Sequence, residues 1–481
     1  MKRYKEIGFM CGLEIHQQIE GKKLFCNCPT EIKKGNPDFT FIRKLRASAG
    51  ESGKVDKAAQ HELEKSKFFE YQGYYDTCCL VEMDEEPPQP VNKDALEAAL
   101  IMTKLLNMKI ADSIQFMRKT VIDGSNVSGF QRTALIGYDG YLEVNGRKIT
   151  VDSLCLEEEA AQVVERTKEK DTYNISRLGI PLLEIATAPE ITTPEECKEV
   201  AAHIGMLLRS TGKCKRGIGS IRQDVNISIK GGARTEIKGF QEIKSIPLVI
   251  EKEIERQQKL IADKPRSEHS SPVESGVRKA ELDGTTTFLR PMPGADRMYP
   301  ETDIDTIQPS HLKIKIPETL TEKQERYVKK WELSEDLAKN IIKEENRYNY
   351  SLEEDFRTYV SPSLSAMTIA TTILNTIPDV ERKTGKTIDF ENYKEQIFGN
   401  LSSGSIASSS LPIILTDITV SKKFDPKKYQ QLSDKEIDSV IKKIIKYNPG
   451  APKGAIIGKA MAEFKGKADG KKVNEIISKL I

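Results

Sequence analysis

The strongest constraint on the fold is a strict alternation of apolar and polar residues over positions 221 to 229. Apolar side chains at 221, 225, 227 and 229 mark one face, and the other face carries Arg222, Asp224, Asn226 and Ser228. Alternation with a period of two is typical of a strand that is buried on one side. The segment therefore predicts a half-buried strand whose polar face is free for binding or catalysis.

A glycine pair, Gly231-Gly232, predicts a turn that leads into a second alternating segment over residues 234 to 238. A two-residue loop would set Ile227 opposite Glu236 and mix apolar and charged side chains on one face. A three-residue loop keeps the polar residues together and requires a glycine in a left-handed conformation. We therefore expect the pairs Lys230 with Arg234, Ser228 with Glu236, Asn226 with Lys238, and Ile227 with Ile237.

Two acidic strings also lie in apolar, strand-like segments: Gly12-Leu13-Glu14-Ile15-His16 and Leu156-Glu157-Glu158-Glu159. A strand would place Glu14 and His16 on one face, within reach of one ion. Carboxylates in apolar surroundings are costly without a cation, so the strings predict a Mg²⁺ and nucleotide site. Each string has an ordinary alternative, namely a solvated strand face for the first and the acidic first turn of a helix for the second.

Two more segments add cations and acids. Residues 118 to 126 contain Arg118, Lys119 and a glycine turn with Ser125, and residues 177 to 185 contribute Arg177 and Glu184. Catalysis of phosphoryl transfer rests on metal ions and cations that stabilise charged oxygens. The combined set favours that chemistry more than any single string does.

The chain of 481 residues is long enough for two to four domains, and its 38% hydrophobic and 30% charged residues are typical of soluble proteins. Without a membrane-spanning run we expect no membrane contact and a cytoplasmic location, where eight cysteines favour thiols or metal ligands over disulfides. Four thiolates are candidates for zinc, although their spacing is unusual and ordinary thiols are the alternative: Cys26, Cys28, Cys78 and Cys79.

The predicted fold class is α+β, with three parts. Residues 1–310 form a catalytic domain with a large mixed or antiparallel sheet and helices over 94–106, 194–211 and 244–261, followed by a polar linker at 262–272. Residues 317–420 form a helical domain, and 421–481 a three-helix tail that starts with a capping box of Ser433 and Glu436. The tail carries fifteen Lys against seven acidic residues, a balance of +8, which favours a polyanion contact over a merely solvated surface.

The strings follow the order and approximate spacing of the GatB/GatE family, whose members activate the side chain of a mischarged aminoacyl-tRNA. The resemblance rests on 12–16, Lys23-Leu24-Phe25-Cys26, 118–119, 156–158, Pro181-Leu182-Leu183-Glu184-Ile185, 222–226 and Glu236-Ile237-Lys238. Residues 43–47, 80–88, 121–126, 128–133 and 298–303 resemble the archaeal GatE branch in particular, and 464–469 resembles the YqeY-like tail of the family.

The resemblance implies that ATP phosphorylates the γ-carboxylate of Glu on Glu-tRNA(Gln) and that ammonia then displaces phosphate, giving Gln-tRNA(Gln). The chain would be part of an ATP-dependent ligase. The implied Mg²⁺ ligands are Glu14, His16, Glu158 and Glu184, and the implied catalytic residues are Glu158, Arg222, Asp224 and Lys238. The implied nucleotide-binding residues are Arg118, Lys119, Ser125, Arg177, Asn226 and Glu236.

The resemblance also implies partners: tRNA, held partly by lysines of the tail, and a GatD-like, asparaginase-type subunit that supplies ammonia within a heterotetramer. Two departures from the family stand out. An insertion similar to part of bacterial-type aspartyl-tRNA synthetases, expected between 257 and 283, has no room here, and the usual Leu-Glu-Glu-Asp ends in Glu159. The competing hypothesis is a non-catalytic tRNA-binding or assembly protein; a phosphohydrolase acting alone lacks a nucleophile-base pair among the five histidines.

Overall fold

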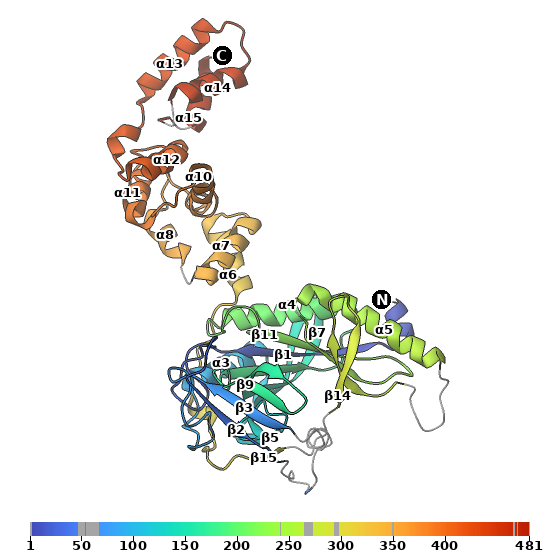
Figure 1. Ribbon diagram of the computed structural model, residues 1–481. Helices are drawn as coiled ribbons and strands as arrows, with labels where there is room; N and C mark the ends of the chain where they lie inside the picture. Colours follow the sequence, from blue (N-terminus) through green and yellow to red (C-terminus); the bar gives the residue numbers. More distant parts are fainter. Residues whose placement is uncertain are drawn as a thin grey trace. The chain divides into compact units, whose positions relative to one another are not determined.

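The computed structural model describes residues 2–46, 53, 67–240, 242–263, 273–292, 298–348, 351–464, 467–468 and 470–480. The described residues fall into two compact units, 1–319 and 320–481. The first unit contains two sheets and the second is helical (Figure 1). The α+β class predicted from the sequence is confirmed.

The large sheet has eleven strands. Their order is β14 (Thr286–Pro291), β13 (Gly276–Ala280), β12 (Thr235–Lys238), β11 (Ile221–Ser228), β1 (Met10–Gln18), β10 (Pro181–Thr187), β7 (Arg147–Glu158), β6 (Phe130–Val144), β5 (Phe116–Thr120) and β15 (Met298–Pro300), with β4 (Lys109–Ile110) beside β6. Only β12 and β13 run parallel among the paired neighbours described, so the sheet is mixed but mostly antiparallel.

The smaller sheet has four strands in the order β2 (Phe39–Arg43), β3 (Phe68–Gly73), β9 (Lys170–Asn174) and β8 (Gln162–Arg166). Tyr71 and Tyr173 are fully buried in its own apolar cluster. Strands β7 and β8 therefore belong to different sheets, and Glu159 lies in the short connection between them.

Helices cover one face of the large sheet, because each presents an apolar stripe to it. They are α3 (Lys93–Leu105), α4 (Pro194–Ser210) and α5 (Ile246–Asp263), with the short α1 (Lys2–Glu6) near the start of the chain. Their apolar residues share one cluster with Leu13, Ile15, Leu183 and Ile185 of the central strands. Figure 1 shows α4 and α5 lying along the sheet. The opposite face of the central strands is thus left for polar side chains.

The hairpin of β11 and β12 has a loop with an odd number of residues, as expected, but the register of its paired residues differs from the prediction. Val225 pairs with Ile237, Asn226 with Glu236 and Ile227 with Thr235, so the predicted pairing is wrong by two residues. The turn is centred on Gly231, whose φ of 84° is left-handed, and Gly232 N donates to Ile229 O at 3.0 Å. The loop expected at 231–233 is longer, because residues 228–234 lie between the paired positions. An odd loop still keeps the polar side chains on one face.

The second unit is made of short helices: α6 (Leu320–Trp331), α7 (Glu335–Tyr348), α8 (Leu352–Tyr359), α9 (Ala366–Thr371), α10 (Ile377–Thr384), α11 (Glu391–Ser402), α12 (Leu411–Ser421), α13 (Asp434–Tyr447), α14 (Lys453–Phe464) and α15 (Gly470–Leu480). Buried apolar residues between Tyr327 and Tyr429 form one cluster, and those between Ile437 and Ile477 form a second one. The predicted capping box of Ser433 and Glu436 is present at the start of α13.

Within the described part of the chain, every helix is too short or too polar to cross a bilayer. Most of the polar linker expected at 262–272, and the end of the 43–47 string, lie outside the described residues.

Candidate active site

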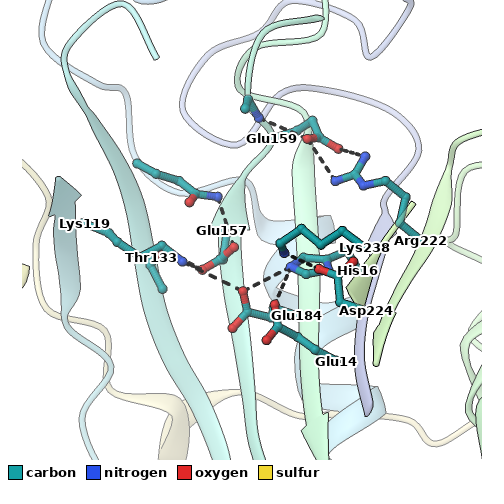
Figure 2. Close-up of polar contacts among 12 residues, drawn as sticks. Glu14, His16, Lys119, Thr133, Glu157, Glu159, Glu184, Arg222, Asp224 and Lys238 are labelled. Atoms are coloured by element: carbon teal, nitrogen blue, oxygen red, sulfur yellow. Dashed lines mark hydrogen bonds and ion pairs between the residues drawn. The ribbon is translucent and has the colours of Figure 1, made fainter. Parts of the chain in front are cut away.

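The polar face of the central strands carries the candidate site. His16 on β1 pairs with Glu184 on β10 and with Arg222 on β11, while Glu14 pairs with Asp224. Because antiparallel partners point to the same face, the register alone gathers these five side chains. All five came from the sequence as site candidates, and the structure brings them together (Figure 2).

His16 is the centre of the group. Its Nε2 lies 3.2 Å from Glu184 Oε2 and 3.3 Å from Glu14 Oε1, and its Nδ1 lies 4.0 Å from Asp224 Oδ2. The imidazole is therefore surrounded by three carboxylates. Its side chain is only 12% exposed, whereas those of Glu14 and Glu184 are 24% and 20% exposed, so the group remains accessible from solvent.

The crowded charges shift several pKa values. Burial, with the charge of Glu184, raises the pKa of Glu14 to about 7. Burial lowers the pKa of His16, but the hydrogen bond and charge of Glu184 outweigh it and raise the pKa to about 9. Burial also raises the pKa of Glu157. Such an excess of carboxylate favours a bound cation, which would replace the protons.

A lysine joins the group from β5. Lys119 Nζ lies 2.7 Å from Glu157 Oε1 and 3.8 Å from Glu184 Oε2. Glu157 also accepts hydrogen bonds from Thr133 Oγ1 at 2.9 Å and Gln131 Nε2 at 3.0 Å. Glu157 is therefore held by three donors, with its carboxylate directed at the site (Figure 2).

Two further cations border the site, and each is held by acidic side chains. Lys238 Nζ contacts Asp224 and lies 2.6 Å from Glu236 Oε1. Burial lowers the pKa of this lysine, but the charges of Asp224 and Glu236 outweigh it and raise the pKa. Arg222 forms a bidentate pair with Glu159, at 2.7 and 3.0 Å. This fork is the stronger geometry for an arginine-carboxylate pair.

Glu159 has a second donor, since Gln18 Nε2 lies 2.9 Å from its Oε2. Burial raises the pKa of Glu159, but the charges of Arg222 and Arg177 outweigh it and lower the pKa. Glu159 thus fixes Arg222 beside the His16 group. The sequence singled out Glu159 only as a departure from the family pattern, and did not reveal this pairing.

The placement of Glu158 in this group is wrong. On β7, Glu157 shares the face of Cys155, which pairs with Glu184, whereas Glu158 lies on the face of the apolar Leu156. Glu158 instead accepts from Arg132 N at 3.0 Å and Arg132 Nη1 at 3.2 Å. The alternation of the strand therefore puts Glu157 where Glu158 was expected.

Three of the expected nucleotide-binding residues are engaged elsewhere. Arg118 Nη2 lies 2.6 Å from Glu301 Oε1 and 3.1 Å from Asp303 Oδ2. Ser125 Oγ donates to Asp123 Oδ1 at 2.6 Å, and Arg177 donates to the carbonyl oxygens of residues 160 and 161, both at 2.7 Å. These contacts do not bring Arg118, Ser125 or Arg177 into the His16 group.

The other three are within or beside the group. Lys119 and Glu236 make the contacts described above, and Asn226 Oδ1 accepts from Arg234 Nε at 3.1 Å. Glu301 binds Arg118 at 2.6 Å and Arg132 at 2.7 Å, and no alternation or charge pattern in the sequence marks it as a site residue. Its string, 298–303, carries no signal in the sequence other than its resemblance to the family.

The donor set fits a divalent cation. Single ligand atoms of Glu14, His16 and Asp224 lie within 4.8 Å of one another, as do those of His16, Glu157 and Glu184. Carboxylate oxygens are the ligands that Mg²⁺ prefers. Phosphate oxygens and water would complete the coordination, since the face is partly open.

A separate cluster collects three of the four candidate zinc cysteines. Cys26, Cys28, Cys79 and Glu82 offer ligand atoms within 4.8 Å of one another. Glu82 Oε1 accepts from Cys26 Sγ at 2.8 Å, and Glu82 Oε2 accepts from Cys79 N at 2.7 Å. Hydrogen bonds from the Cys26 and Cys28 thiols lower the pKa of Cys79. Cys78 is not part of this set; it packs in the cluster under the small sheet.

Known proteins are similar to this chain over nearly its whole length. A family model described as the GatB/GatE catalytic domain matches residues 9–316, and one described as the GatB domain matches 354–481. The chain is similar to the E-type subunit of glutamyl-tRNA(Gln) amidotransferase from Methanococcus maripaludis, with 36% identity over 99% of the chain and 98% of the relative. It is 35% identical to the protein of the same name from Methanocaldococcus jannaschii, over 99% of each.

The protein of this name from Thermococcus gammatolerans is 33% identical, over 99% of the chain and 98% of the relative. These alignments span 625 to 629 positions, more than the 481 residues of the chain. The relatives therefore contain residues that have no counterpart here.

Proposed function

The chain belongs to the GatB/GatE family, and from that premise we propose that it activates glutamate on Glu-tRNA(Gln) with ATP and converts it to glutamine. An oxygen of the γ-carboxylate attacks the terminal phosphorus of ATP, and ADP leaves. Ammonia then attacks the acyl carbon of the mixed anhydride, loses a proton, and phosphate departs. The relatives named as glutamyl-tRNA(Gln) amidotransferase subunits support an amidotransferase that acts on tRNA.

One observation carries the proposal: carboxylates and cations meet on one solvent-accessible sheet face around His16. In this proposal Mg²⁺ is held by one of two sets that share His16: Glu14, His16 and Asp224, or His16, Glu157 and Glu184. The metal, when bound, supplies positive charge to the oxygens of the transferring phosphoryl group. The acidic set alone would repel both ATP and the substrate carboxylate, so this neutralisation is a requirement.

The cations have a second role. Arg222, Lys238 and Lys119 each lie against a carboxylate of the site, so each is fixed before substrate arrives. Fixed cations stabilise charge that develops on the phosphoryl oxygens without further reorganisation. Arg222 is the most exposed of the three, with 36% of its side chain accessible. We assign it the contact with the phosphoryl group, and Asn226 and Glu236 contacts with the nucleotide.

Cys26, Cys28, Cys79 and Glu82 are proposed to hold a zinc ion. The set offers three thiolates and one carboxylate, enough for a closed tetrahedral site of the structural kind. Such a site would tie residues 26–28 to residues 79–82. The role is structural in this proposal, because the cluster includes none of the residues around His16.

The partners follow from the reaction. Ammonia would come from an asparaginase-type subunit of the GatD kind, within a heterotetramer, and the lysines of the last sixty residues would contact tRNA phosphates. The test is direct: purified chain, with ammonium chloride as nitrogen source, should form Gln-tRNA(Gln) and ADP from Glu-tRNA(Gln) and ATP. Binding of tRNA without any ATP consumption would support a non-catalytic binding protein instead.

A further inference from the structure

The connection between α4 and β11, residues 211–220, lies beside the site and has no role in the reaction derived above. It contains Lys215, Arg216, Gly217, Ile218 and Gly219 in succession. Ile218 is 110% exposed, more than any other exposed large hydrophobic residue in the described part of the chain. A single exposed apolar side chain is common on protein surfaces. The position of this one, between basic residues and the site, needs an explanation.

The loop is built to present Ile218. Ser220 donates from N at 3.3 Å and from Oγ at 2.8 Å to the carbonyl oxygen of Gly217, which closes a four-residue turn. Gly219, the third residue of that turn, has φ of 82°, and Gly217 has φ of 108°. A positive φ at the third position is typical of a type II turn and favours glycine. Ile218 is therefore held at the tip.

Two basic residues precede the turn and behave differently. Lys215 is anchored, because its Nζ contacts the carbonyl oxygen of Thr30 and its N donates to Gln18 O at 2.8 Å. Arg216 is exposed, and no carboxylate among the described residues pairs with it. An unpaired guanidinium next to an exposed apolar side chain suits a ligand that has both a phosphate and a flat apolar surface.

The strand register gives the distance from Ser220, the last residue of the turn, to the site. Gln18 N donates to Ser220 O at 2.9 Å, and two residues along the same strands His16 pairs with Arg222. Two residues of a strand span about 7 Å. An extended glutamyl group is of comparable length. A nucleotide at the turn would thus place an amino acid esterified to it at the His16 group.

We propose that Arg216 and Ile218 bind the unpaired 3′-terminal nucleotides of the RNA that carries the amino acid. Arg216 contacts a backbone phosphate, and Ile218 packs against a base. This inference rests on the proposed function, since it presumes an aminoacylated RNA. ATP is a poorer occupant, because nucleotide pockets are concave. The turn is convex: apart from each glycine and its two neighbours in the chain, no heavy atom of the described residues lies within 4 Å of a Cβ placed on Gly217 or Gly219.

The test compares Arg216→Ala and Ile218→Ala with the matched surface variants Lys104→Ala and Leu282→Ala. Lys104 is exposed on α3, which covers the opposite face of the sheet, and Leu282 is 88% exposed in the turn between β13 and β14. Binding is measured with intact tRNA and with tRNA that lacks its 3′-terminal nucleotides. KM values for Glu-tRNA(Gln) and ATP are measured with ammonia as nitrogen source.

We expect both loop variants to bind intact tRNA at least about fivefold more weakly and to raise the KM for Glu-tRNA(Gln) similarly. On the shortened tRNA the loop variants should bind as the wild type does, and the KM for ATP should not change. Equal losses on both RNAs, or no loss relative to the control variants, would overturn the proposal. A raised KM for ATP alone would assign the turn to the nucleotide instead. The binding arms require no turnover, so a wild-type chain that binds tRNA but consumes no ATP would contradict only the proposed reaction.

Discussion

Glu157 and Glu158 are adjacent in the chain, yet their side chains serve opposite faces of β7. Glu157 accepts from Lys119 at 2.7 Å on the face of the His16 group, and Glu158 accepts from Arg132 at 3.0 Å on the other face. The two glutamates therefore offer a matched pair of substitutions. They differ by one position and by one face of the sheet.

Glu157→Gln should lower kcat for ATP-dependent amidation about a hundredfold, because it removes a charge that faces the proposed metal. Affinity for tRNA should be nearly unchanged, since it rests on phosphate contacts elsewhere. Glu158→Gln should retain more activity but lower the free energy of unfolding by about 1–3 kcal/mol, because Arg132 loses a buried negative charge and one of its two acceptor oxygens. Product formation and urea unfolding test both variants; the reverse ranking of activities would contradict the placement.

Binding of Mg²⁺ should release protons and become stronger as the pH rises through 7. The pKa of Glu14 is raised to about 7, so below that pH the metal must displace a proton. The pKa of His16, about 9, extends the dependence to higher pH. Calorimetric titration with Mg²⁺ near pH 6 and near pH 8, in two buffers of different ionisation enthalpy, measures the protons released. Glu14→Gln serves as the control and should release fewer protons. If Mg²⁺ binds to the wild type without releasing any proton, Glu14 is not a ligand.

Glu301 should contribute to stability at neutral pH and lose that contribution in acid. Burial raises its pKa, but hydrogen bonds from Arg118 and Arg132 outweigh this and lower the pKa to about 2. A carboxylate whose pKa is lowered in the folded state stabilises the fold at pH values above its pKa in the unfolded chain. That stabilisation is lost as the pH falls toward 2. Glu301→Gln should therefore reduce the drop in unfolding free energy between about pH 5 and pH 3, by about 1–2 kcal/mol after allowance for solvent screening. An identical drop in both proteins would mean that Glu301 is not held in this way.

Zinc should depend on Cys79 but not on Cys78. Cys79 belongs to the cluster with Cys26, Cys28 and Glu82, whereas Cys78 packs under the small sheet. Elemental analysis of purified protein should find zinc in the wild type and in Cys78→Ser, and little in Cys79→Ser. Loss of zinc from Cys78→Ser with retention in Cys79→Ser would contradict the cluster.

Removal of the last three helices should weaken tRNA binding and flatten its salt dependence. Tyr429 packs in the apolar cluster that precedes these helices. Truncation after residue 432 keeps this cluster complete, whereas truncation at 421 would remove Tyr429 from it. Residues 433–481 hold eleven Lys and six acidic residues, a balance of +5. Fewer released counterions give a shallower slope of affinity against salt, while activity at saturating Glu-tRNA(Gln) should persist. An unchanged slope would show that these lysines contact only solvent.

The sequence predicted the elements that carry the site. Alternation over 221–229 located β11 and its polar face, and the helices expected over 94–106 and 194–211 correspond to α3 and α4. The odd number of loop residues in the β11–β12 hairpin was also predictable, because one face of both strands had to be buried. Its register was not, since a shift by two residues keeps every side chain on the same face and leaves the pattern satisfied.

The sequence by itself determined which residues are polar and which elements bear them, because period and propensity are local properties. The sequence also indicated that Glu157 and Glu158 lie on opposite faces of their strand. Leu154 and Leu156 mark the apolar face, and Glu158 follows them at the same spacing of two residues. Only the tertiary structure decided the partners. The contacts of Arg222 with Glu159, Arg118 with Glu301, and Cys26 with Glu82 each join segments that are far apart in the chain. Separations of this length leave no periodic trace in the sequence, and only the packing of strands and loops brings the partners within hydrogen-bonding distance.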